Sequence, residues 1–164
     1  MKIRAIKAKA PNVGKMRLTL LNEMRDIGGE IEQDFRNTVA TWDHKPAFNV
    51  KISLAGGTPS VEVTTDDEIY KYVDEGTRAH FVAPTNAKAL AFSPNYTAKT
   101  SPGVLGSRAG GKSGAVVFSK GHMVSGIEAR RFSEKIIKKW HGTFGKRMAQ
   151  AMAAAAIATG HGKG

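Results

Sequence analysis

The chain has 164 residues, no cysteine and a formal net charge of +11 at pH 7. This length is typical of one ordinary domain, and the lack of cysteine excludes disulfides and cysteine-ligated metals. No apolar run approaches the roughly 18 residues of a membrane span, so we expect no contact with a membrane.

The charge is unevenly distributed along the chain. Residues 1–20 carry six basic groups and no acid, residues 21–98 carry seven basic and twelve acidic groups, and residues 99–147 carry eleven basic and two acidic groups. Basic surface attracts phosphate backbones. Patches of opposite sign also allow identical subunits to associate head to tail, as in a ring.

The first long element is a predicted helix over residues 15–40. Residues 1–14, which precede it, alternate basic with small or apolar side chains and are predicted to be a basic N-terminal arm or an edge strand. Gly28 and Gly29 lie within the helix and are expected to weaken or bend it. The apolar stripe that predicts the helix recurs at steps of three and four. It consists of Leu20, Met24, Ile27, Ile31, Phe35 and Val39.

A region of short strands and turns follows. Alternating apolar and polar residues predict a hairpin with one buried face, and two further strands come later. These predicted strands are residues 48–54, 61–64, 89–92 and 115–118. Residues 66–75 are predicted to form either a short helix or an extended piece. Residues 97–114 are rich in glycine and serine and are predicted to be a flexible loop.

The last element is an amphipathic helix predicted over residues 132–157, followed by a disordered tail at 158–164. Its apolar residues repeat every four positions: Phe132, Ile136, Trp140, Phe144, Met148 and Met152. The order of elements predicts a single α+β domain. In it, an antiparallel or mixed β-sheet is packed by the long N-terminal helix and the C-terminal helix.

One motif with possible chemistry has the wrong context. Residues 106–113 read GSRAGGKS and match the phosphate-binding loop of nucleotide hydrolases, leaving a small hydrolase as one hypothesis. That loop needs a buried strand before it and a helix after it. Here residues 100–103 are a poor strand, and residues 114–118 have a strand pattern. We therefore interpret the motif as a flexible basic loop that contacts DNA phosphates or becomes ordered on assembly.

No catalytic or metal-binding group is evident elsewhere. The five histidines form no close pair at helical spacing, so a zinc site is not expected. Asp74 and Glu75 are adjacent and do not face each other as an acid–base pair would, so we interpret them as solvated or subunit-interface charges. We predict that the protein is not an enzyme and has no catalytic residue, cofactor or metal.

Three motifs occur in order in the second half of the chain. Residues 70–92 read YKYVDEGTRAHFVAPTNAKALAF, and residues 122–132 read HMVSGIEARRF, immediately before the last helix. The motif positions are Tyr72, Val73, Glu75, Gly76, Thr77, Arg78 and His80; then Pro84, Ala87, Lys88, Ala89, Leu90 and Phe92; and finally His122, Gly126 and Phe132.

These motifs resemble a family of tail-completion and head–tail joining proteins (minor tail, or neck, proteins) of long-tailed double-stranded DNA bacteriophages. The resemblance covers residues 68–155, and the earlier part of the chain fits only in having a leading helix. Three features depart from the family pattern. Ala79 and Arg131 stand where the family has proline, and two extra residues separate His122 from Gly126.

The resemblance implies a structural protein of the virion neck that joins the tail to the DNA-filled head and is made in the host cytoplasm. It implies a tail-completion-like domain spanning the chain, in several copies that form a hexameric ring. The implied partners are a tail-tube or tail-terminator protein, head-completion or connector proteins, and genomic double-stranded DNA, contacted without sequence specificity. The alternative is a non-specific DNA-binding protein that is not part of the virion.

Candidate contact residues follow from the charged positions near turns. We expect the subunit or partner interface to include Arg78, His80, Lys88, Asp74 and Glu75. We expect a loop in contact with the DNA channel or with a neighbouring subunit to include Arg108, Lys112 and Lys120.

Overall fold

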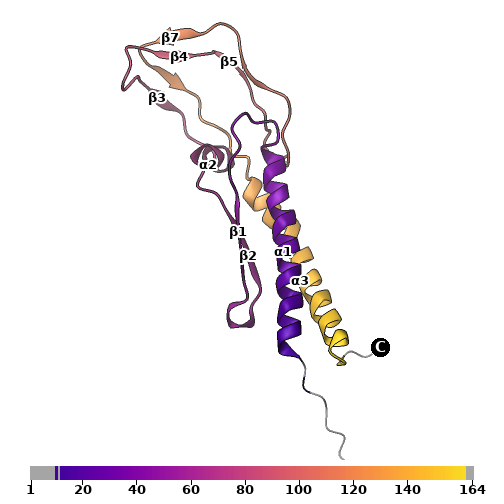
Figure 1. The fold of residues 1–164 in the computed structure, drawn as a ribbon. Helices are drawn as coiled ribbons and strands as arrows, with labels where there is room; N and C mark the ends of the chain where they lie inside the picture. The colour runs from indigo at the N-terminus through magenta and orange to yellow at the C-terminus, as the bar shows by residue number, and fades with distance from the viewer. Residues whose placement is uncertain (1–9, 11, 162–164) are drawn as a thin grey trace, which may run out of the picture. The chain divides into compact units, whose positions relative to one another are not determined.

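The structure is a computed structural model that describes residue 10 and residues 12–161 (Figure 1). The arm or strand predicted for residues 1–14 lies mostly outside these residues, but its last two, Val13 and Gly14, belong to a helix instead. Of the tail predicted at 158–164, residues 162–164 lie outside the described residues, and Ala158 is the last residue of a helix. The elements, in order, are α1 (Val13–Thr38), β1 (Asn49–Ser53), η1 (Ala55–Gly57), β2 (Ser60–Thr64), α2 (Glu68–Glu75), β3 (His80–Val82), β4 (Leu90–Phe92), β5 (Asn95–Thr97), β6 (Gly111–Ser113), β7 (Val117–Ser119), β8 (His122–Val124) and α3 (Phe132–Ala158).

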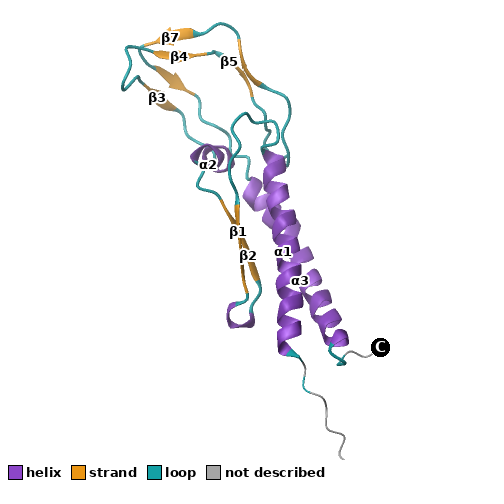
Figure 2. Ribbon diagram, in the orientation of Figure 1, coloured by secondary structure: helices purple, strands orange, loops and turns teal. Residues whose placement is uncertain are grey.

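The predicted α+β class is confirmed. Two long helices pack together and are accompanied by small two-stranded antiparallel sheets (Figure 2). In the described part of the chain, the strands pair as β1 with β2, β3 with β8, β4 with β7, and β5 with β6. Six of the eight strands have three residues, because closely spaced turns interrupt the pairing. The sequence predicted a sheet but not its division into separate ribbons.

The leading helix α1 begins two residues earlier than predicted. Asn12 caps it, since the Lys15 N–H donates to the Asn12 side-chain oxygen at 3.0 Å. The helix continues through Gly28, which allows close packing with β1. A Cβ atom at Gly28 would lie 2.7 Å from Cγ1 of Val50. The glycine therefore lets the β1–β2 hairpin lie directly on the helix.

Two compact units make up the described chain, and both long helices contribute to each. The first unit contains α1 up to Ile31, residues 50–63 and α3 from Lys139. Its buried apolar residues are Leu20, Met24, Ile27, Trp140, Met148, Ala151 and Ala155. Arg147 also links the two helices here, because its guanidinium donates to Glu23 and Glu30 at 2.6 Å each. These two hydrogen bonds raise the pKa of Arg147.

The second unit contains residues 32–49 and 64–138 and is built around an aromatic cluster. Tyr70 lies at the centre of this cluster, with its ring centroid 5.1 Å from Phe48, 6.1 Å from Phe132 and 6.3 Å from both Phe35 and Trp42. Burial raises the pKa of the Tyr70 hydroxyl. The cluster holds α2, the end of α1 and the start of α3 around one core.

The segment with two predicted outcomes, residues 66–75, contains helix α2. Asp67 is its N-cap, and its carboxylate accepts from the Tyr70 N–H at 2.7 Å and pairs with His44. Burial alone would raise the pKa of Asp67, but the hydrogen bonds from His44 and Tyr70 outweigh burial and lower it. Thus α2 is capped by a carboxylate that is most stable in its charged form.

The predicted apolar stripe of the last helix is correct except at Phe144 and at its end. Phe132, Ile136, Trp140 and Met148 are buried, but Phe144 is only half-buried and Met152 is exposed. An α-helix has 3.6 residues per turn, so a repeat of exactly four drifts around the helix by about 40° at each step. After several steps Met152 has turned outward, and Ala151 and Ala155 occupy the buried face.

Candidate functional site

The first and third motifs meet where α3 begins. We call this meeting point the motif junction and define it by residues 73–78 and 126–133. The Asp74 carboxylate caps α3: it accepts from the backbone N–H groups of Phe132 and Ser133 and from the Ser133 hydroxyl at 2.6 Å. The backbone of the first motif adds two acceptors, because the carbonyls of Val73 and Asp74 accept from the Arg130 and Arg131 N–H groups.

Two glycines allow the two motifs to approach this closely. Gly76 has φ +79°, and a Cβ atom there would lie 2.7 Å from the Ile127 carbonyl oxygen. A Cβ atom at Gly126 would lie 2.0 Å from the Thr77 carbonyl oxygen. Paired hydrogen bonds complete the crossing: the Thr77 N–H donates to the Ile127 carbonyl at 2.9 Å, and the Ile127 N–H donates to the Thr77 hydroxyl at 3.0 Å. Larger residues at either glycine would separate these backbones.

The middle motif joins the same structure through an aromatic contact. Phe92, at the end of β4, stacks on the ring of His122 in β8, with ring centroids 4.2 Å apart. Strand β8 in turn pairs with β3, so that His122 lies opposite Val82. All three motifs therefore belong to one connected structure within the second unit, although they lie far apart in the sequence.

The predicted interface residues fall into two groups. Arg78, His80, Lys88 and Glu75 are exposed, as a contact surface requires. Asp74 is half-buried, and its carboxylate is engaged within the chain as the cap of α3. Asp74 therefore has a structural role within the chain.

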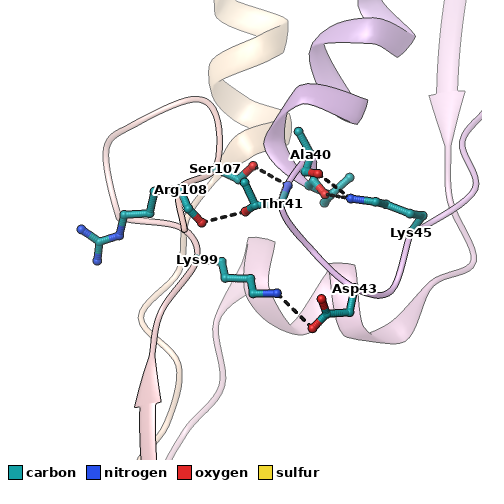
Figure 3. A network of polar contacts seen from close by, with 8 residues as sticks. Ala40, Thr41, Asp43, Lys45, Lys99, Ser107 and Arg108 are labelled. Carbon is teal, nitrogen blue, oxygen red and sulfur yellow. Dashed lines mark hydrogen bonds and ion pairs between the residues drawn. The ribbon is translucent and has the colours of Figure 1, made fainter. Parts of the chain in front are cut away.

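The predicted loop 97–114 is anchored at both ends and in the middle. Its ends pair as strands, since Thr97 of β5 lies opposite Gly111 of β6. In the middle, the Thr41 N–H donates to the Ser107 hydroxyl at 3.0 Å, and the Thr41 hydroxyl donates to the Arg108 carbonyl at 2.8 Å (Figure 3). Its flexibility stays a prediction, but these bonds attach it to the segment that follows α1.

Two lysines take part in the same polar network, one from the loop and one from the segment that follows α1 (Figure 3). Lys99 is largely buried and donates to the Asp43 carboxylate at 3.0 Å. Lys45 donates to the carbonyls of Val39 and Ala40, at 3.0 and 2.5 Å, and so satisfies acceptors left free at the end of α1. The bonds from Thr41 and Lys99 therefore attach the loop to the segment that follows α1.

Those exposed cations are the residues predicted to contact DNA or a neighbour. Lys112 lies in β6, and Lys120 lies in the turn between β7 and β8. The Arg108 side chain donates through Nε to the Ala98 carbonyl at 3.0 Å. All three side chains are exposed. They are available to a negatively charged partner.

The nucleotide-binding motif does not have the geometry of a phosphate-binding loop. Its Lys112 and Ser113 lie in strand β6, and the next helix, α3, begins only at Phe132. A phosphate-binding loop places these residues at the start of a helix, where backbone N–H groups face the phosphates. Among residue 10 and residues 12–161, no group of three histidine or acidic side chains is placed to hold a metal ion. Within the same residues, no helix is long and apolar enough to cross a membrane.

The backbone at Arg131 has an unusual conformation. Arg131, which stands where the family that the motifs resemble has proline, has φ +53°. The ring of proline fixes its φ at a negative value, so proline could not adopt this conformation. The turn that leads into α3 is therefore built differently here from one containing proline, and the backbone bond between Arg131 and Asp74 holds it.

The residues most important to the junction were only partly visible in the sequence. The glycines and Phe132 belong to the motifs, but nothing local shows that Asp74 caps a helix that begins 58 residues later. A capping residue is normally sought immediately before its own helix. No protein-family model, curated protein or solved structure matches the chain.

Proposed function

We propose that the chain is a non-enzymatic structural protein of the neck of a tailed bacteriophage. In this role it joins the tail to the DNA-filled head as one of several copies in a ring, with six copies implied by the resemblance. Its neighbours are a tail-tube or tail-terminator protein on one side and head-completion or connector proteins on the other. Genomic DNA passes through the ring and is contacted without sequence specificity.

The observation that carries the proposal is the motif junction. The motifs that resemble the joining family are not scattered over the fold. They meet through the Asp74 cap, through the glycine crossing at Gly76 and Gly126, and through the stacking of Phe92 on His122. A resemblance produced by chance would not be expected to select residues that contact one another so closely.

The surface of the second unit supports assembly rather than catalysis. Large apolar side chains are exposed on its short strands, among them Phe81, Phe118 and Met123. Exposed apolar patches of this kind mark surfaces that partners cover. The same stretch of the sequence carries exposed cations, among them Arg78 and Lys120, that suit either a DNA backbone or an acidic protein surface.

Deletion of the gene from the phage genome that would carry it tests this function. We expect the lysate, viewed by electron microscopy, to contain DNA-filled heads and separate tails that have not joined. Supplying the wild-type chain from a plasmid restores joined particles and serves as the control. Normal infectious particles from the deleted phage would overturn the proposal and favour the free DNA-binding protein.

A further inference from the structure

The short strands of the second unit present an apolar face that the chain itself leaves uncovered. We call it the ribbon face and define it by Phe81 and Met123. The exposed fractions of these side chains are 61% and 63%. Side chains of this size are exposed so fully in a soluble protein mainly where another surface covers them.

The strand register places these two residues on one side. Phe81 lies directly opposite Met123 in the β3–β8 pair, so both side chains point to the same face.

The other side of this strand pair is occupied by a different contact. His122 precedes Met123 in β8, and its ring contacts the ring of Phe92. Neighbouring strand residues point to opposite faces, so Met123 and its partner Phe81 point away from this ring contact. Gly121 leaves room for the Phe81 ring, because a Cβ atom there would lie 2.5 Å from it.

The ribbon face is set in a strongly basic part of the chain. Residues 78–131 contain eight lysine or arginine residues and one acid, Glu128, which is a net charge of +7. Most of these cations are exposed: Arg78, Lys88, Arg108, Lys112, Lys120 and Arg131. An apolar patch with such surroundings favours a partner whose own apolar patch is bordered by acids.

The same chain carries a patch of that kind on α2. We call it the α2 face and define it by Ile69 and Tyr72, which are one helical turn apart and 53% and 49% exposed. The exposed acids Asp66, Glu68 and Glu75 border it, and Lys71 is the one base on this helix. The opposite side of α2 is fixed by the burial of Tyr70, so the α2 face must remain outward.

We propose that the ribbon face of one copy docks on the α2 face of a second copy of this chain. The two patches match in apolar character and are opposite in charge, and each is too exposed to be covered within its own copy. Contact between two different patches on identical chains is head-to-tail, and each copy keeps one patch free for the next. Such contacts close into a ring when the rotation between copies permits.

The proposal rests on the proposed function for the ring itself and adds which surfaces form it. Its test needs only the purified full-length chain, whereas the joining function is tested in the phage. Failure of one is therefore distinct from failure of the other. If purified copies do not associate, the docking is refuted. Unjoined heads and tails in the deletion experiment would still support the joining function, which would then depend on other contacts.

The test uses two variants that each remove one face. F81S/M123S removes the ribbon face, and I69S/Y72S removes the α2 face. We expect the wild-type chain to form oligomers and each variant alone to be a monomer by size-exclusion chromatography with light scattering. An equal mixture should form a one-to-one dimer, because the mixture contains one competent ribbon face and one competent α2 face.

Several results would overturn the proposal. If I69S/Y72S still associates with itself, the ribbon faces pair with each other, and if the mixture stays monomeric, the two faces do not meet. A wild-type chain that remains monomeric at all concentrations also refutes it. The matched control is L18S, which removes another exposed apolar residue, 57% exposed on α1, and should leave association unchanged. Circular dichroism verifies that every variant is folded.

Charge gives an independent measurement on the same protein. The variant E68K/E75K should weaken association, and added salt should weaken that of the wild-type chain, because the acidic and basic borders attract across the contact. Association that is unchanged by both would show that the charges play no part in docking and would overturn this assignment of the two faces.

Discussion

Replacing Asp74 by alanine removes the carboxylate that holds the first motif against the start of α3. This carboxylate accepts hydrogen bonds from the N–H groups of Phe132 and Ser133 and from the Ser133 hydroxyl. Loss of an N-cap typically costs about 1–2 kcal/mol, and a hydrogen bond to a charged group contributes about 1.5–3 kcal/mol. Because Asp74 is only half-buried, water can form some of these hydrogen bonds when the carboxylate is removed, and this reduces the loss of stability. We therefore expect a loss of about 3 kcal/mol in the free energy of unfolding.

Urea unfolding followed by circular dichroism measures this loss. Asp74→Asn retains one acceptor oxygen and should lose about 1 kcal/mol. Glu75→Ala is the matched control, because its exposed side chain is the next along the helix, and it should change stability by less than about 0.5 kcal/mol. In a chain of this length, the alanine variant at position 74 should melt roughly 6–12 °C lower. Equal stability of D74A and E75A would refute the capping role and the motif junction built on it.

Three further changes test other parts of the structure. Gly126→Ala should destabilise the chain by about 1–3 kcal/mol in urea unfolding, because its Cβ atom would lie 2.0 Å from the Thr77 carbonyl oxygen. An unchanged free energy of unfolding would show that the two backbones do not approach this closely. Phe132→Ala should cost about 3–5 kcal/mol because this side chain is fully buried, whereas Ile137→Ala, at an exposed position, should cost little; similar losses would contradict the core. The pKa of Asp67 is lowered by folding, so the stability it contributes is complete above its ordinary value of 3.8 and is lost as pH falls through its folded value. The stability difference between the wild-type chain and Asp67→Asn should therefore shrink in acid, and a difference independent of pH would contradict the ion pair.

The long helices could be predicted because their core residues follow a simple period. The stripe from Leu20 to Val39 predicts α1 to within two residues at each end, and all of its members except Ile31 are buried. The same reasoning wrongly placed Met152 on the buried face, because a search for large apolar residues passes over small buried ones such as Ala151. Periodicity thus identified the helices and misjudged part of one buried face.

The contacts that bring the motifs together could not be predicted in the same way. A capping bond between Asp74 and α3, or the approach of Gly126 to Thr77, joins positions that are distant in the sequence and have no common period. Their pairing depends on how β3 to β8 fold back along the chain. The sequence indicated which glycines were important but not which backbone each one allows to approach.

The division of the strands into separate ribbons was also invisible in the sequence. Alternation predicts that a segment is extended, but it does not identify the partner strand. The three later pairs are nested along the sequence: β5 pairs with β6, β4 with β7, and β3 with β8. The exposed ribbon face arises from this pairing, since it aligns Phe81 with Met123. Sequence reasoning had found only the charged residues near it.

The most direct measurement of the central claim is the location of the chain in purified infectious particles, by cryo-electron microscopy of the joint between head and tail. A neck protein predicts ring-shaped density at the joint into which the two units of the chain fit, with the chain retained through purification in high salt. Absence of the chain from purified particles, together with its presence on free DNA in the same lysate, would contradict the joining function and establish the DNA-binding alternative.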